Sequence, residues 1–338
     1  MGGPSQGIEI FSTCPQSSDI TGDRYVRRVA EIARWSERHG CSGMLVYTDN
    51  RLVDPWLVAQ IVVQSTERLC PLVAVQPVYK HPYAVAKVVS SFGHLYRRRV
   101  FLNLVAGGFR NDLESLGDST PHDERYDRLL EYGLIIQDLL AGTEPVTREG
   151  TYYRVHGLAL SPRQPAGLMP GMFVSGSSLR GLASAEALGA TAILYPGPPG
   201  EDRGAWQHRC SAGVRVGIIA RDTTEEAWRV AHARFPEDRR GEITHQLAMK
   251  TSDSSWHAKL SSLDDGGSGE PSPYWLTPFR TYRSFCPYLV GSHRAVAAVV
   301  SRYLALGYRT LLLDIPAEEV ELEHIGVVLR AAQAEVAP

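Results

Sequence analysis

The sequence predicts a closed (β/α)8 barrel, and three observations support this fold class. Eight short apolar runs alternate with helical stretches along the 338 residues, and eight is the strand number of this barrel. Most of the runs are continuously apolar, which is typical of parallel strands covered on both faces. The sequence also lacks an early Gly-x-Gly-x-x-Gly turn, which marks an open dinucleotide-binding sheet. We therefore expect a single barrel domain over residues 1–338.

The predicted strands are rich in β-branched and apolar residues and are bounded by residues typical of turns. They cover residues 8–13, 42–48, 69–76, 100–106, 172–176, 191–195, 215–220 and 309–315. The predicted helices lie between them. Gly40 follows the first helix, Pro55 stands at the first position of the second after the cap Asp54, and Pro82 opens the third. The helices cover residues 23–39, 54–65, 81 onward, 123–140, 178–188, 224–235, 292–306 and 318–334.

Two stretches interrupt this alternation. Residues 142–170 contain a tyrosine-rich run between Gly150 and Gly157, which predicts a small hairpin before the fifth strand. Residues 236–289 form a longer insertion, whose most linker-like run is 264–273. Because the insertion follows the seventh strand, we expect it to be a mobile lid over the barrel mouth. Its part 250–275 has few apolar anchors and is expected to be poorly ordered without ligand.

Composition excludes several classes of protein. Lys and Arg number 35, Asp and Glu number 37, and the resulting net charge of −2 argues against a nucleic-acid binder. No apolar run approaches the roughly 20 residues that a bilayer-spanning helix needs, so no membrane association is expected. The five cysteines are far apart and form neither a disulfide framework nor a zinc pattern. We therefore expect a cytoplasmic protein without a metal site.

The carboxyl ends of the predicted strands indicate the active site, because barrels of this kind build it from the loops that follow the strands. The most informative loop is the turn of Ser175, Gly176, Ser177 and Ser178, which joins a strand directly to a helix. Free amides at a helix N-terminus, with hydroxyls and a glycine, can bind a phosphate. Asn103 lies in an otherwise apolar strand, where a buried amide needs partners, and this indicates a role in a site.

Several segments in the correct order resemble the bacterial-luciferase-like flavin monooxygenases. They are residues 80–87, 99–108, 122–128 and 149–153, together with the turn at 175–178. Residues 215–228 and 289–292 resemble the alkanesulfonate monooxygenase branch, and the resemblance extends over about residues 7–335. It implies a barrel that takes reduced FMN (FMNH2) from a separate NAD(P)H:flavin reductase. The flavin reacts with O2, and the resulting flavin peroxide oxygenates a small organic substrate. It also implies a homodimer or homotetramer, for which Val58 and Val62 are candidate interface residues.

The resemblance assigns roles to individual residues. Tyr126 matches a tyrosine that hydrogen-bonds the FMN phosphate, and the turn at 175–178 matches the phosphate-binding turn. The cofactor-binding residues implied are Gln76, Asn103, Tyr126, Ser175, Gly176, Ser177 and Ser178. Three residues match branch positions near the substrate, with Arg280 as the alternative to the lid arginine Arg283. They are Tyr195, Arg215 and Arg283, and Asp314 at the end of the eighth strand is a further candidate for the chemistry.

The sequence departs from the alkanesulfonate branch at three positions. Gly217 replaces a histidine, Leu52 replaces a cysteine, and Asp314 stands where the branch has an uncharged residue. A carboxylate at Asp314 either disfavours an anionic substrate or pairs with an arginine. The substrate therefore stays open. Two other functions also stay open, a deazaflavin-dependent oxidoreductase on the same barrel and a non-catalytic flavin-binding subunit. Oxygen consumption with reduced FMN separates them from the monooxygenase.

Overall fold

Eight parallel strands close into a barrel in the computed structural model, which describes residues 7–18, 20–198, 210–249, 255–263 and 272–336. The order around the barrel is β1-β2-β3-β4-β7-β8-β9-β12, and β12 pairs with β1 to close the ring. The predicted fold class is therefore confirmed, with each predicted strand in place. The barrel strands are β1 (Glu9–Thr13), β2 (Gly43–Val46), β3 (Cys70–Val75), β4 (Phe101–Val105), β7 (Gly171–Ser175), β8 (Thr191–Leu194), β9 (Ala212–Arg221) and β12 (Thr310–Leu313).

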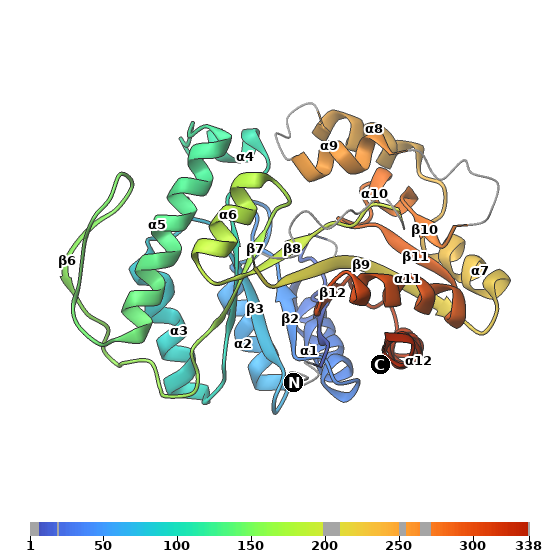
Figure 1. Cartoon of the computed structure of the whole chain (residues 1–338), viewed down its shortest axis with the longest axis horizontal. Coiled ribbons are helices and arrows are strands. Elements are labelled where there is room, and N and C mark those ends of the chain that lie inside the picture. The colour runs from blue at the N-terminus through green and yellow to red at the C-terminus, as the bar shows by residue number, and fades with distance from the viewer. Residues whose placement is uncertain (1–6, 19, 199–209, 250–254, 264–271, 337–338) are drawn as a thin grey trace.

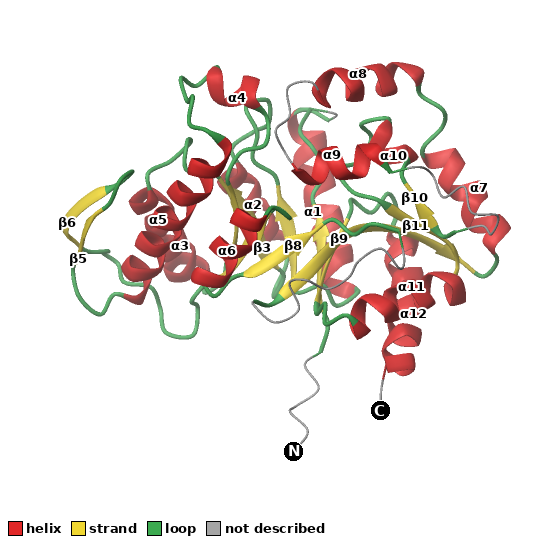
Figure 2. Cartoon of the chain, turned by 45° about the horizontal axis from the view of Figure 1, so that its top comes forward, coloured by secondary structure: helices red, strands yellow, loops and turns green. Residues whose placement is uncertain are grey.

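Helices cover the outside of the barrel (Figures 1 and 2). Their starts follow the expected chemistry. Asp54 accepts a hydrogen bond from the Trp56 amide at 2.9 Å with Pro55 at the first helical position, and Ser292 caps a later helix. These helices are α1 (Gly22–Arg38), α2 (Pro55–Ser65), α3 (Pro82–Tyr96), α4 (Arg110–Glu114), α5 (His122–Ala141), α6 (Leu179–Ala187), α7 (Thr224–Arg234), α11 (His293–Ala305) and α12 (Glu319–Val336).

The inside of the barrel is filled by apolar side chains of the strands. Phe11 makes edge-to-face contacts with Phe101 and Phe173, at ring-centroid distances of 5.1 Å in both cases. Leu45 and Leu312 belong to the same buried cluster. This cluster fills the barrel interior, and barrels of this kind bind ligands at the loops that follow the strands.

The hairpin predicted within 142–170 is present. Strands β5 (Val146–Glu149) and β6 (Arg154–Leu158) pair antiparallel, and the hairpin lies outside α5 at one end of the molecule (Figures 1 and 2). The Glu131 carboxylate of α5 accepts hydrogen bonds from the amides of Thr151 and Tyr152, both at 2.9 Å. This carboxylate fixes the hairpin turn against the helix.

The described part of the insertion at 236–289 has regular secondary structure. It contains α8 (Arg239–Met249), α9 (Ser255–Ser262), β10 (Tyr274–Trp275) and α10 (Thr277–Arg280), and it leads into β11 (Tyr288–Ser292). Strand β11 pairs with the outer half of β9, and β10 pairs with β11. The predicted lack of apolar anchors is wrong for the described part, because Trp256, Leu260 and Trp275 pack into the protein. Residues 250–254 and 264–271 of that prediction lie outside the described residues.

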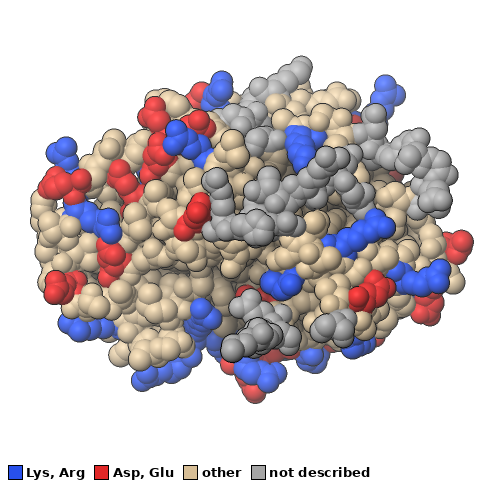
Figure 3. Space-filling view, in the orientation of Figure 1, with Lys and Arg blue, Asp and Glu red and all other residues tan. Residues whose placement is uncertain are grey.

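The surface corrects one prediction. Val58 and Val62 are buried against the core, so they cannot supply an interface; Leu57 is the exposed apolar residue of α2. Lys and Arg are interspersed with Asp and Glu on the face in Figure 3. Among the described residues, no helix is long and apolar enough to cross a membrane.

Candidate active site

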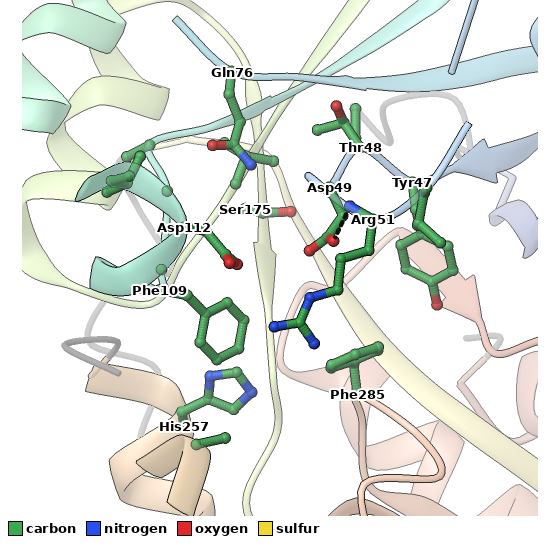
Figure 4. A pocket seen from close by; sticks show the side chains of 18 of the residues that line it. Tyr47, Thr48, Asp49, Arg51, Gln76, Phe109, Asp112, Ser175, His257 and Phe285 are labelled. Atoms are coloured by element: carbon green, nitrogen blue, oxygen red, sulfur yellow. Dashed lines mark hydrogen bonds between the residues drawn. The ribbon is translucent and has the colours of Figure 1, made fainter. Parts of the chain in front are cut away.

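A cavity of ≈ 810 Å³ opens at the carboxyl ends of the barrel strands, and its volume is typical of a cofactor site. Its floor comes from the barrel strands. Its walls come from the loops after β2 and β4, from α8 and α9, and from the segment before β11 (Figure 4). The predicted site residues that line the cavity are Gln76, Asn103, Tyr126, Ser175, Tyr195 and Arg215. The barrel therefore brings together side chains that are far apart in the sequence.

Arg215 of β9 gives the cavity floor a fixed positive charge. It is 5% exposed, donates a hydrogen bond to the Tyr47 hydroxyl, and lies 5.2 Å from the centroid of that ring. Its Nε has no hydrogen-bond partner among the described residues. An unsatisfied buried donor is costly, so the floor offers a donor that a ligand can use. Burial raises the pKa of the neighbouring Tyr195, which therefore stays protonated at neutral pH.

Asn103 and Ser175 form a polar pair on adjacent strands. Ser175 Oγ donates to Asn103 Oδ1 at 2.8 Å, and Asn103 is only 4% exposed. Strands β4 and β7 are hydrogen-bonded neighbours, and this pairing places the two residues together. The hydrogen bond occupies the amide oxygen, so the NH2 group is the part of Asn103 left for a ligand.

Tyr126 of α5 packs against the turn after β7. A Cβ atom on Gly176 would stand 2.5 Å from the Tyr126 hydroxyl oxygen, and one on Gly181 would stand 3.1 Å from its Cε1. Gly176 also has a φ of 142°, which L side chains rarely adopt. Ser178 caps α6 by accepting from the Gly181 amide at 3.0 Å. The two glycines therefore let a tyrosine hydroxyl lie beside a helix N-terminus, a combination of donors suited to a phosphate.

A column of stacked rings forms one wall of the cavity. Trp256 of α9 lies parallel to Tyr195 at a centroid distance of 3.6 Å, and His257 stacks on Trp256 at 3.7 Å. Phe109 and Phe279 lie 5.5 Å and 5.6 Å from the His257 ring. The column anchors α9 to the end of β8, so the inserted helix belongs to the cavity wall.

Several predicted residues do not line the cavity. Arg283 forms an ion pair with Asp238 at 2.7 Å, and Arg280 donates to the Leu263 carbonyl. Asp314 accepts hydrogen bonds from Ser284 at 2.7 Å and from the Tyr288 hydroxyl at 2.8 Å. Ser177 and Ser178 lie at the start of α6, outside the lining residues. A phosphate that contacts Ser177 and Ser178 would therefore lie at the edge of the cavity.

The structure explains why Gly217 stands where the alkanesulfonate branch has histidine. A Cβ atom at Gly217 would lie 2.3 Å from Cζ of Tyr288, and the two residues are register partners on β9 and β11. The Tyr288 ring therefore fills the space of a side chain at 217. Its hydroxyl contacts Asp314, so the glycine, the tyrosine and the carboxylate form one buried unit.

The residues that the sequence analysis missed come mainly from loops and from the insertion. They include Tyr47, Asp49, Arg51, Phe109, Asp112, Trp256, His257 and Phe285. Tyr47, Asp49 and Arg51 follow the end of the second strand, so reading every strand end as a site would have found them. Trp256 and His257 carried a weaker signal, an aromatic pair inside a polar stretch.

The cavity residues fit a flavin mononucleotide. The turn at Gly176 and the Tyr126 hydroxyl suit its phosphate. The Asn103–Ser175 pair, Gln76 and the unpaired Arg215 Nε suit a ring with several hydrogen-bonding edges. The stacked wall gives an apolar boundary on one side.

The chain is similar to known monooxygenases over most of its length. A family model described as luciferase-like monooxygenase matches residues 8–310. A curated relative from Niallia circulans, "4-(gamma-L-glutamylamino)butanoyl-[BtrI acyl-carrier protein] monooxygenase BtrO", is 32% identical over 329 residues, which cover 95% of this chain and 96% of the relative.

Two solved structures share the fold. Long-chain alkane monooxygenase (LadA) has a TM-score of 0.74 at 17% identity, with 99% of this chain and 93% of that chain covered. The oxygenating constituent of 3,6-diketocamphane monooxygenase from the CAM plasmid of Pseudomonas putida, in complex with FMN, has a TM-score of 0.67 at 16% identity, with 98% of each chain covered.

Proposed function

The chain belongs to the luciferase-like monooxygenase family, and from this premise we propose that it is the oxygenating component of a two-component, FMNH2-dependent monooxygenase. Its partner is a separate NAD(P)H:flavin reductase, and its co-substrate is O2. The observation that carries the proposal is the cavity lined by Tyr126, the Asn103–Ser175 pair and Arg215 at the strand ends, with the Gly176 turn packed against Tyr126 at its edge. When bound, the reduced flavin supplies the electrons and activates O2.

The chain's own residues bind the cofactor, orient it and keep water away. Tyr126 and the amides at the start of α6 hold the phosphate, and Asn103 and Gln76 bind the ring edge. Arg215 keeps its charge in the floor, where it stabilises negative charge that develops on the ring. The Tyr195–Trp256 stack closes the wall next to it. Exclusion of water favours transfer of oxygen to substrate over release of hydrogen peroxide.

The Niallia circulans relative supports an acyl substrate rather than an alkanesulfonate. The substrate in its name is an acyl group on a carrier protein, and it is similar over almost the whole chain. The branch histidine is replaced by Gly217 here, and Tyr288 fills its space. We therefore propose a linear acyl substrate, either free or carrier-bound, in place of an alkanesulfonate.

Two measurements test the proposal. Oxygen uptake with reductase-supplied FMNH2 and an acyl substrate should give a product one oxygen atom heavier by mass spectrometry. Tyr126→Phe should weaken reduced-FMN binding about tenfold in an anaerobic titration, because it removes one charge-assisted hydrogen bond. Tyr152→Phe, on the hairpin, is the matched control and should bind normally. Unchanged FMN affinity in Tyr126→Phe would show that the phosphate lies elsewhere, and oxidation of a deazaflavin without oxygen uptake would support the alternative cofactor.

A further inference from the structure

The mouth of the cavity carries two carboxylates that face each other. Asp49 comes from the loop after β2 and Asp112 from α4, and both point into the cavity (Figure 4). Burial raises the pKa of Asp112 above its ordinary value, the nearby Asp49 carboxylate raises it further, and the charge of Arg51 offsets part of this rise. Two negative charges that share a partly buried space repel each other, and a cation placed between them relieves this repulsion.

A guanidinium extends into the same space. Arg51 reaches into the cavity with its head between Phe109 and Phe285 in the view of Figure 4. Its backbone amide donates to Asp49 Oδ1 at 2.9 Å, which fixes the loop. Its charge lowers the pKa of the neighbouring Asp112, so it interacts with that carboxylate through space. Its planar set of donors can bind a ligand carboxylate through two parallel hydrogen bonds.

A buried histidine gives independent support for a ligand at this place. His257 of α9 lines the cavity and is 2% exposed, and neither of its ring nitrogens has a hydrogen-bond partner among the described residues. Phe109, Trp256 and Phe279 surround it. A neutral imidazole has one donor and one acceptor, and leaving both unused in an aromatic environment costs free energy. A ligand with a neutral polar group, such as an amide, satisfies them.

We propose that this mouth binds an α-amino-acid head group at the far end of the substrate. Arg51 binds the carboxylate, Asp49 and Asp112 bind the ammonium group, and His257 hydrogen-bonds an amide that joins the head to the acyl chain. The inference rests on the proposed function for the acyl chain, which extends from the mouth toward the floor. The opposite charges of Arg51 and the two aspartates select a zwitterion over a simple anion or cation.

Three probes that differ only in the head group test the charge pattern. They are the γ-N-butylamide of L-glutamic acid, which has both charges; N-butylglutaramic acid, which lacks the ammonium; and 4-amino-N-butylbutanamide, which lacks the carboxylate. Isothermal titration of the full chain should show the zwitterion binding at least tenfold tighter than either analogue. One charge-assisted hydrogen bond corresponds to about a tenfold change.

Variants assign each charge to its partner. Arg51→Gln should weaken the two carboxylate-bearing probes about tenfold and leave the ammonium-only probe unchanged, and Asp112→Asn should show the reverse pattern. His257→Phe should weaken all three, since each contains the amide. Arg154→Gln, an exposed arginine of the hairpin, is the control and should change nothing.

Equal affinity for the three probes, no binding of the zwitterion at millimolar concentration, or unchanged binding in Arg51→Gln would overturn the head-group site. These titrations need no flavin, so they separate the two proposals. If the three probes bind with the expected order of affinity but no FMNH2-dependent oxygen uptake is measured, the proposed function is wrong and the head-group site is still supported.

Discussion

Replacing Gly217 by alanine tests the packing that separates this chain from the alkanesulfonate branch. The added methyl group would lie 2.3–2.5 Å from three ring atoms of Tyr288, well inside contact distance. The ring cannot move away easily, because it is 1% exposed, its hydroxyl donates to Asp314 at 2.8 Å, and its backbone belongs to β11. Overpacking a rigid core costs about 1–3 kcal/mol. We expect the upper end, ~3 kcal/mol, with a fall in Tm of about 4 °C for a chain of this length.

Urea unfolding of four proteins forms a double-mutant cycle that isolates this contact. Tyr288→Ala alone should cost about 3–5 kcal/mol, because it leaves a cavity. In that background Gly217→Ala should cost less than ~0.5 kcal/mol, since the space it needs is then open. The reasoning is refuted if Gly217→Ala is tolerated in the wild-type background, or if its cost is the same with and without the Tyr288 ring.

Three further predictions concern the cavity wall and the outer helices. Trp256→Ala removes the stacked ring of the wall, so the ratio of hydrogen peroxide to oxygenated product should rise several-fold; an unchanged ratio means that α9 does not exclude water. Burial lowers the pKa of His257 to about 3. The unfolded chain therefore gains a proton below pH ~6.5 that the folded chain does not. The free energy of unfolding should thus fall as the pH drops from about 6.5 toward 3. Between pH 7 and 5, the urea midpoint of His257→Phe should change less than that of the unmodified protein. Glu321 accepts two hydrogen bonds from Arg234, at 2.8 and 2.9 Å, in a buried pair. Glu321→Gln should lower the free energy of unfolding, measured with urea, by about 3 kcal/mol. The exposed Asp23→Asn is the control and should lower it by under 1 kcal/mol.

The sequence by itself determined the barrel, and it singled out several strand-end residues that the structure brings together. Each barrel strand and most of the helices outside the barrel are encoded by local periodicity and by residues at their ends, such as Pro55 after Asp54. The Gly176 turn was also readable, because a tight strand-to-helix connection with hydroxyls is a local pattern. Asn103 could be singled out because an amide in an apolar strand must be satisfied by something. The family resemblance placed Tyr126 beside that turn, and the glycine contacts agree with this placement.

Only the tertiary structure decided which loops meet over the barrel and which side chains face inward. The glycines and serines of the insertion predicted a poorly ordered segment. Composition could not predict that Trp256 stacks on Tyr195, because the two residues are far apart in the sequence. Val58 and Val62 were predicted to face outward, but the structure packs both against the core. Arg283 pairs with Asp238 outside the cavity, while Arg51 reaches into it. The physical reason is that local propensity determines where helices and strands form. The partner of a long or charged side chain depends instead on which loops come together when the barrel closes.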